Sequence, residues 1–148
     1  MEDWKNTKLD DEAMWPKQTV VPLDAAHADA RGMIQSLVNT PMKNISLITS
    51  VKGSLRSNHY HKTDWHYIYM LEGEVDYYYR PTGSSEKPKV IRARKGDMIW
   101  TPPMEDHTTI AIEDSVFLAI SRNPRDQEAY EADVVRVELI DPKPYIIR

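Results

Sequence analysis

The chain of 148 residues contains no cysteine. Disulfide bonds and thiolate chemistry are therefore excluded, and any metal ion would have to be held by imidazole and oxygen ligands. The sequence also lacks a long basic run, and its formal net charge is -4. Because proteins neutralise nucleic-acid phosphates with clustered Lys and Arg side chains, we do not expect nucleic acid as a partner.

Long apolar runs are missing as well. No stretch approaches the ~20 apolar residues that are needed to cross a bilayer. The start MEDWKNTKLDDEAMW is polar and lacks the basic and apolar segments of a signal peptide. We therefore expect a cytoplasmic protein without a membrane partner. Hydrophobic residues make up 41% and charged residues 28% of the chain, so a folded domain is expected rather than a disordered one.

Short strand-like runs dominate the sequence after residue 32, and glycine or proline separates most of them. We predict strands at 33–38, 44–51, 65–71, 74–80, 89–94, 97–101, 108–112, 116–121 and 134–140. This pattern is typical of an antiparallel sandwich or barrel. We predict a polar, loosely ordered lead-in at 1–19 and a single domain at 20–148. A short helix is predicted at 124–131, with Asn123 as its cap and Pro124 in its first position.

Three of the five histidines lie in the segment HYHKTDWH, residues 59–66. Side chains alternate between the two faces of a strand, so His59 and His61 are expected on the same face. The following four residues predict a turn, after which His66 would open the next strand. If these two strands form a hairpin, His66 comes close to the other two imidazoles.

The remaining histidines lie far away in the sequence. His107 can join the first three only if a barrel closes, and His27 is expected to lie outside the group. The simpler alternative is that these are ordinary surface or hydrogen-bonded histidines, because an HxH pair alone is weak evidence for a metal site.

Two segments resemble the motifs of the cupin superfamily. Residues 53–73 read G-x5-H-x-H-x4-H-x6-G, and residues 96–111 read G-x5-P-x-M-x2-H-x3-A. The family patterns are G-x5-H-x-H-x3,4-E-x6-G and G-x5-P-x-G-x2-H-x3-N. The spacings agree throughout, and the resemblance covers residues 40–121. It implies an all-β fold, an antiparallel jelly-roll barrel, with a metal or substrate site inside it.

The chain departs from the cupin pattern at three positions. His66 stands where most members have glutamate, which would leave a metal ion with neutral ligands and its full charge. Met104 replaces a glycine, so we expect a different turn there, with this side chain near the cavity mouth. Ala111 replaces an asparagine and removes one hydrogen-bonding group.

The resemblance implies a divalent transition metal, with Fe, Ni and Zn as the candidates. The expected ligands are His59, His61, His66 and His107. His66 has two further possible roles, a supporting hydrogen bond or proton transfer without coordination, and we name it as a candidate catalytic residue.

Alternation along the strands predicts which other side chains face the site. Ser57, Ile68, Met70, Thr109 and Ala111 are expected to point inward, with Tyr67, Tyr69 and Leu71 on the opposite face. The acidic residues near the site, Glu105 and Asp106, are expected to be solvated, and Asp64 is expected to be a turn residue.

The run of three tyrosines must divide between the two faces of its strand. Either Tyr78 or the pair Tyr77 and Tyr79 points inward, and we take Tyr78 as a second candidate catalytic residue. Trp65 and Trp100 add large rings nearby. Sheet packing and a homodimer interface explain these aromatic residues better than a stacking platform for a sugar or ring-shaped substrate.

Several functions are compatible with these residues. The main hypothesis is a metal-dependent enzyme that acts on a small molecule, either as an iron-dependent dioxygenase or as a sugar or carboxylate isomerase, epimerase or lyase. Residues 29–32 and 53–62 also look like segments in cupins of sugar-nucleotide metabolism, some of which use histidine bases without metal. A non-enzymatic ligand-binding or sensor cupin is the remaining alternative.

Overall fold

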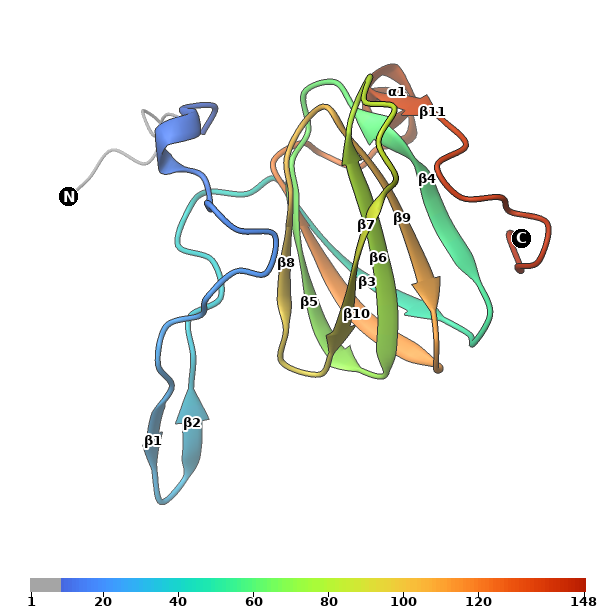
Figure 1. Cartoon of the computed structure of the whole chain (residues 1–148). Helices are drawn as coiled ribbons and strands as arrows, with labels where there is room; N and C mark the ends of the chain where they lie inside the picture. The colour runs from blue at the N-terminus through green and yellow to red at the C-terminus, as the bar shows by residue number, and fades with distance from the viewer. Residues whose placement is uncertain (1–8) are drawn as a thin grey trace.

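Two antiparallel sheets face each other in the computed structural model, which describes residues 9–148 (Figure 1). The first sheet has the order β3 (Asn44–Ser50), β10 (Ser115–Ser121), β5 (His66–Glu72) and β8 (Met98–Thr101). The second has the order β11 (Val134–Arg136), β4 (Leu55–His61), β9 (Glu105–Ala111), β6 (Glu74–Pro81) and β7 (Lys89–Arg94). The predicted all-β, jelly-roll arrangement is confirmed.

The core lies between the two sheets and follows the alternation of the strands. In β5 every second residue is buried, among them Ile68 and Met70. They pack in one cluster with Phe117 of the neighbouring strand β10 and with Val75 and Tyr77 of β6 in the other sheet. Each fully buried side chain of this size contributes roughly 1.5–3 kcal/mol, so this cluster supplies much of the force that closes the barrel.

The part of the predicted lead-in that the structure describes is attached to the barrel. Residues Glu12–Met14 form a 3-10 helix, and the ring of the following Trp15 lies 5.7 Å from that of Trp100. The carbonyl of Thr19 accepts a hydrogen bond from the Trp100 N–H. The prediction of a loosely ordered lead-in is therefore wrong for residues 9–19, and the rest of it, 1–8, lies outside the described residues.

Strands β1 (His27–Asp29) and β2 (Gly32–Ile34) form a small hairpin that stands clear of the barrel (Figure 1). The predicted strand at 33–38 therefore ends early, because only its first residues have a neighbour to pair with. The predicted strand at 134–140 is shortened for the same reason, since only Val134–Arg136 pairs with β4.

The one α-helix in residues 9–148, α1 (Gln127–Asp133), begins later than predicted. Asp126 caps it by accepting a hydrogen bond from the Ala129 N–H. Asn123, the predicted cap, instead donates its backbone N–H to Asp64. The predicted cap is wrong because this asparagine is used to tie the loop to the turn before β5. No helix in the described part of the chain is long and apolar enough to cross a membrane.

Candidate functional site

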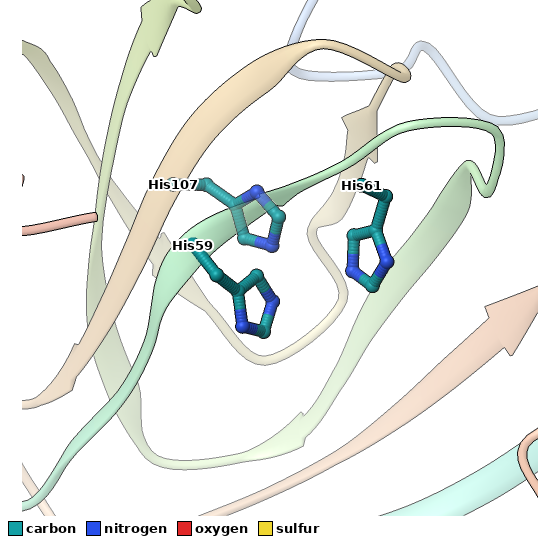
Figure 2. A group of neighbouring side chains, drawn as sticks. All are labelled: His59, His61 and His107. Carbon is teal, nitrogen blue, oxygen red and sulfur yellow. The ribbon is translucent and has the colours of Figure 1, made fainter. Parts of the chain in front are cut away.

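Four histidines from three strands converge inside the barrel. His59 and His61 come from β4, His107 from β9 and His66 from β5. The ring centroid of His59 lies 4.8 Å from that of His61 and 4.7 Å from that of His107. Figure 2 shows these three rings turned toward one shared space. All four rings are buried, and the predicted histidine cluster is present.

His66 joins the cluster by a route that the sequence analysis did not predict. The expected hairpin is wrong, because β4 pairs with β9 and β11 whereas β5 pairs with β8 and β10. His66 therefore approaches from the opposite sheet. Its ring centroid lies 5.6 Å from that of His61 and 5.5 Å from that of His107. The exposed His27 lies outside the cluster, as predicted.

A β-bulge just before the HxH pair determines how His59 points. Ser57 and Asn58 both have positive φ angles, 76° and 59°, and the register with β9 shifts between Ser57 and His59. Asn58 tolerates this conformation, and its Oδ1 accepts hydrogen bonds from the Thr108 hydroxyl and from the Ile140 N–H. The bulge places His59 opposite His107 in the ladder.

Hydrogen bonds orient two of the imidazoles. His107 Nδ1 lies 3.0 Å from the Glu105 carbonyl oxygen, so Nδ1–H donates and Nε2 keeps its lone pair. That Nε2 atom is buried and has no partner among residues 9–148. His61 Nδ1 lies 3.3 Å from Asp133 Oδ2, which likewise leaves the other nitrogen of this ring free.

The pKa values of all four histidines are lowered, chiefly because burial disfavours the charged form. The pKa of His59 falls to about 2 and that of His107 to about 3. Burial also lowers the pKa of His61, but Asp133 opposes this shift. The cluster is therefore neutral at pH 7, and His61 is the member whose protonated form has a carboxylate to stabilise it.

Asp133 is a site residue that the sequence analysis missed. Besides His61, its carboxylate accepts hydrogen bonds from the Thr63 N–H, the Thr63 hydroxyl and the Asp64 N–H. It thus fixes the turn between β4 and β5 from the end of α1. No motif marks this position, and only the tertiary contact between helix and turn reveals it.

The histidines line a cavity of about 190 Å³. Its other lining residues are Ile48, Arg56, Ser57, Ile68, Thr109, Phe117, Ala119, Arg125 and Tyr130. The predicted inward positions of Ser57, Ile68 and Thr109 are thus found at the cavity, whereas Met70 and Ala111 are buried elsewhere in the barrel. The sequence analysis missed Arg56, Arg125 and Tyr130.

The structure does not bring Tyr78 to the histidines. Tyr77 is fully buried and its ring centroid lies 6.2 Å from that of His107, so the odd-numbered pair points inward. Tyr78 lies on the other face of β6, between Thr108 and Val90 in the ladder. Tyr78 therefore does not reach the site, and its prediction as a catalytic residue is wrong. Tyr130, whose ring centroid lies 5.8 Å from that of His61, is the tyrosine at the cavity.

The turn at Met104 keeps a left-handed backbone although a side chain replaces glycine. Its φ angle is 57°, so the expectation of a different turn is wrong. The Met104 N–H donates to the His61 carbonyl, a bond that holds the residue in this conformation. The side chain is 49% exposed and does not line the cavity.

The carboxylates near the site are more buried than predicted. Asp106 is buried and lies 3.5 Å from Arg80, and Glu105 is half-buried. Asp64 does lie in the turn before β5, but burial raises its pKa to about 6. One of its oxygens lies within 4.8 Å of nitrogens of His61 and His66, so it adds a charge that the sequence analysis did not count.

Glu105 should make folding stability depend on pH. Burial raises its pKa from 4.5 to about 7, although it accepts a hydrogen bond from the Tyr77 hydroxyl at 2.9 Å. Between these pH values the folded state holds a proton that the unfolded chain releases, so stability falls as pH rises through this window. Glu105→Gln should reduce this pH-dependent fall in the free energy of unfolding by roughly 1–2 kcal/mol, a figure that allows for the partial exposure of the side chain. Urea unfolding of both proteins at pH 5, 6, 7 and 8 tests this, and parallel pH curves would contradict it.

Comparisons with known proteins agree on the fold. No family model and no curated protein matches the chain. Among solved structures, a QdtA 3,4-ketoisomerase variant from Thermoanaerobacterium thermosaccharolyticum in complex with TDP has a TM-score of 0.62 and 22% identity, covering 76% of this chain and 82% of that chain. A dTDP-4-dehydrorhamnose 3,5-epimerase from Sulfolobus tokodaii has a TM-score of 0.65 and 18% identity, covering 88% and 91%.

A third match is an RmlC dTDP-6-deoxy-D-glucose-3,5-epimerase from Legionella pneumophila, with a TM-score of 0.63 and 18% identity. It covers 82% of this chain and 73% of that chain. At this level of identity the likeness speaks for the fold and leaves the reaction to the residues of the site. The chain shares the jelly-roll barrel fold of these structures, which is the fold that the resemblance of its two motifs implies.

Proposed function

We propose that this protein isomerises or epimerises a keto-sugar by moving a proton at a carbon next to the carbonyl, with His61 as the base. One observation carries this assignment: among the four buried histidines of residues 9–148, only His61 hydrogen-bonds a carboxylate. The structural neighbours named as ketoisomerases and epimerases support the same class of reaction.

The pairing with Asp133 gives His61 the two properties of a base. It holds Nδ1 as the donor, so that the lone pair of Nε2 is free, and it stabilises the imidazolium that forms when a proton is taken up. His59 and His107 lack such a partner, and their pKa values of about 2 and about 3 make them poor proton acceptors. They suit hydrogen bonding to substrate oxygens instead.

Proton removal leaves its electron pair on the carbonyl oxygen, as an enediolate. Return of a proton to the opposite face of the same carbon re-forms the ketone and gives an epimer. Return of the proton to the former carbonyl carbon, with transfer of the adjacent hydroxyl proton to the former carbonyl oxygen, gives the isomeric ketone. Tyr130 of α1 also lines the cavity, and we assign it as the donor of the proton that is returned to carbon. Arg56 and Arg125 line the same cavity and provide positive charge for an anionic part of the substrate.

Exchange of protons with solvent tests the proposal directly. The purified protein would be incubated in D₂O with TDP-4-keto-6-deoxyglucose, the ligand of one structural neighbour, and followed by NMR. We expect deuterium at a carbon beside the keto group. Binding of this nucleotide without proton exchange would contradict the proposed enzymatic activity and favour a ligand-binding protein. If the protein neither binds this nucleotide nor exchanges its protons, this substrate is excluded. The same assay would then be run on other keto-sugars.

A divalent metal, Fe, Ni or Zn, is the second candidate for the histidine cluster. One nitrogen each of His59, His61 and His107 lies within 4.8 Å of the others, and the buried Nε2 of His107 has no partner in residues 9–148. The donor set fits such an ion, with His66 as a possible fourth ligand. When bound, the ion would polarise a substrate oxygen.

Metal content separates the two candidates. The protein would be purified without a nickel column, reconstituted under anaerobic Fe(II) or with Zn(II) or Ni(II), desalted and measured by elemental analysis. A stoichiometric ion in the wild type that is lost in His59→Ala/His107→Ala supports the metal site. Proton exchange by protein that holds no metal supports the histidine base alone, and oxygen uptake with Fe(II) would instead indicate a dioxygenase.

A further inference from the structure

A second cavity lies outside the barrel, on the opposite side of β5 from the histidines. Its volume is about 220 Å³, whereas about 150 Å³ is enough to hold benzene, so one small molecule fits. Residues 9–15 form one wall and stand outside the barrel (Figure 1). This cavity, the tryptophan pocket, is lined by Leu9, Asp11, Met14, Trp15, Thr40, Trp65 and Tyr67.

The tryptophan pocket and the histidine cavity are separate, although they share one strand. His66 and Ile68 of β5 line the histidine cavity, whereas Tyr67 and the preceding Trp65 line the tryptophan pocket. This division follows from the alternation of side chains along a strand. None of the described residues lines both cavities. A ligand of the tryptophan pocket therefore does not depend on which reaction the histidines perform.

Three aromatic side chains line the tryptophan pocket. The ring centroids of Trp15 and Trp65 lie 6.2 Å apart with their planes at 57°, and those of Trp65 and Tyr67 lie 6.2 Å apart at 86°. Rings at such steep angles do not stack on one another, so they can form adjoining walls. The indole N–H of Trp15 donates to the Leu9 carbonyl at 2.8 Å, which fixes this ring. Aromatic ring faces attract organic cations.

Asp11 is the charged residue among those that line the tryptophan pocket. One of its oxygens accepts a hydrogen bond from the Ala13 N–H at 3.1 Å, and the residue forms no ion pair within residues 9–148. Its neighbour Asp10 differs, because both of its oxygens accept hydrogen bonds from Arg122 at 2.7 Å. The pocket thus combines aromatic walls with one negative charge that no described side chain neutralises.

The Trp65 side chain adds an unmet hydrogen bond. Its indole N–H is buried and has no acceptor within residues 9–148. Hydrogen bonds from Arg122 lower the pKa of Asp10, and this N–H adds a smaller effect, although it lies too far from the carboxylate to form a hydrogen bond. Leaving a buried donor unpaired is unfavourable, so a ligand with an acceptor oxygen would stabilise the pocket.

We propose that the tryptophan pocket binds a small alkylated ammonium compound that also carries a hydroxyl group. The aromatic rings and the Asp11 carboxylate hold the cation, and the hydroxyl oxygen accepts a hydrogen bond from the Trp65 N–H. An unsubstituted ammonium group fits less well, because it brings three N–H donors and the lining side chains offer few acceptors beyond Asp11 and Thr40. A fully alkylated group has no donor to satisfy, and its methyl groups suit the apolar Leu9 and Met14.

Choline, which has a trimethylammonium group and a hydroxyl group, is the probe that tests the proposal. It would be titrated into the full chain and followed by NMR of the indole N–H groups. We expect the resonances of Trp15 and Trp65 to shift with a dissociation constant of about 0.1–1 mM. The uncharged isostere 3,3-dimethyl-1-butanol should bind about 10-fold more weakly, and ethyltrimethylammonium, which lacks the hydroxyl group, about 3–10-fold more weakly. Equal binding of choline and its uncharged isostere overturns the cation site, and equal binding of ethyltrimethylammonium overturns the role of the Trp65 N–H.

Asp11→Asn should weaken choline binding about 10-fold, because asparagine can keep the cap of the 3-10 helix and removes only the charge. Glu12→Gln is the matched control. It removes a charge from the next residue, which does not line the pocket, and should change binding less than about twofold. Tyr67→Leu removes one ring without altering residues 9–15 and should weaken binding about 10-fold. Circular dichroism shows whether each variant is folded.

Two results overturn the proposal as a whole. If 10 mM choline leaves the indole resonances of the wild type unmoved, the pocket is closed to such a ligand by other residues of the chain or by a second copy. If Asp11→Asn binds choline as tightly as the wild type does, the carboxylate has no part in recognition and the pocket is not a cation site.

Discussion

Gly73→Ala is expected to lower the free energy of unfolding by about 3–5 kcal/mol, enough to unfold many domains of this size. Gly73 lies between β5 and β6 and has a φ angle of +82°, a conformation that disfavours any side chain. An added Cβ would also lie 2.7 Å from Ser115 Cα and nearer still to the Asp114 carbonyl oxygen. These are backbone atoms, which cannot turn away as a flexible side chain can. Chemical denaturation followed by circular dichroism measures the loss.

Gly53→Ala is the matched control for this experiment. Gly53 has nearly the same φ angle, +86°, but a Cβ added there would meet no atom within 4 Å. Only the backbone conformation opposes the substitution, so we expect a loss of about 1 kcal/mol. Equal losses at the two glycines would show that the close approach of the β10 backbone has no part in the requirement at Gly73.

Asp133→Asn is expected to reduce solvent exchange of the keto-sugar protons by roughly 10²–10⁴-fold, the usual worth of a positioned base. The amide offers an N–H group where the carboxylate accepted one, so it favours the wrong tautomer of His61 and no longer stabilises the imidazolium. His61→Asn should lose at least as much exchange. The rate is measured by NMR in D₂O, with binding of the nucleotide measured separately.

Asp126→Asn is the control for a structural effect. Asp126 caps the same helix but is exposed and does not line the cavity, and asparagine is itself a good cap. This variant should keep both stability and exchange. If Asp133→Asn binds the nucleotide and exchanges protons at the wild-type rate, the assignment of His61 as the base is wrong.

The sequence was sufficient to predict the cluster of His59, His61, His66 and His107 because motif spacing and strand alternation are local properties. It failed on how His66 arrives, since pairing two adjacent strands as a hairpin is the simplest topology and the barrel does not use it. It also failed on Tyr78, because a run of three tyrosines shows that the faces alternate without showing which face is buried.

The remaining site residues could not be found from sequence for a different reason. Asp133, Arg125 and Tyr130 belong to α1 and the loop before it, and they reach the histidines only through tertiary packing. An aspartate at the end of a helix has no pattern that distinguishes it from a solvated one. The bulge at Ser57 and Asn58 is similarly invisible, because these residues are equally common in ordinary turns.

The hydrogen bonds of Asn58 also determine when the site can form during synthesis. Its side chain bonds both backbone groups of Ile140, and its carbonyl accepts from the Val137 N–H. The base, His61, likewise depends on Asp133. A nascent chain that has emerged only as far as β10 contains all four histidines, but it contains neither Asp133 nor Ile140. The strands up to β10 can therefore fold together first, and the site is complete only after residues 133–140 have also left the ribosome.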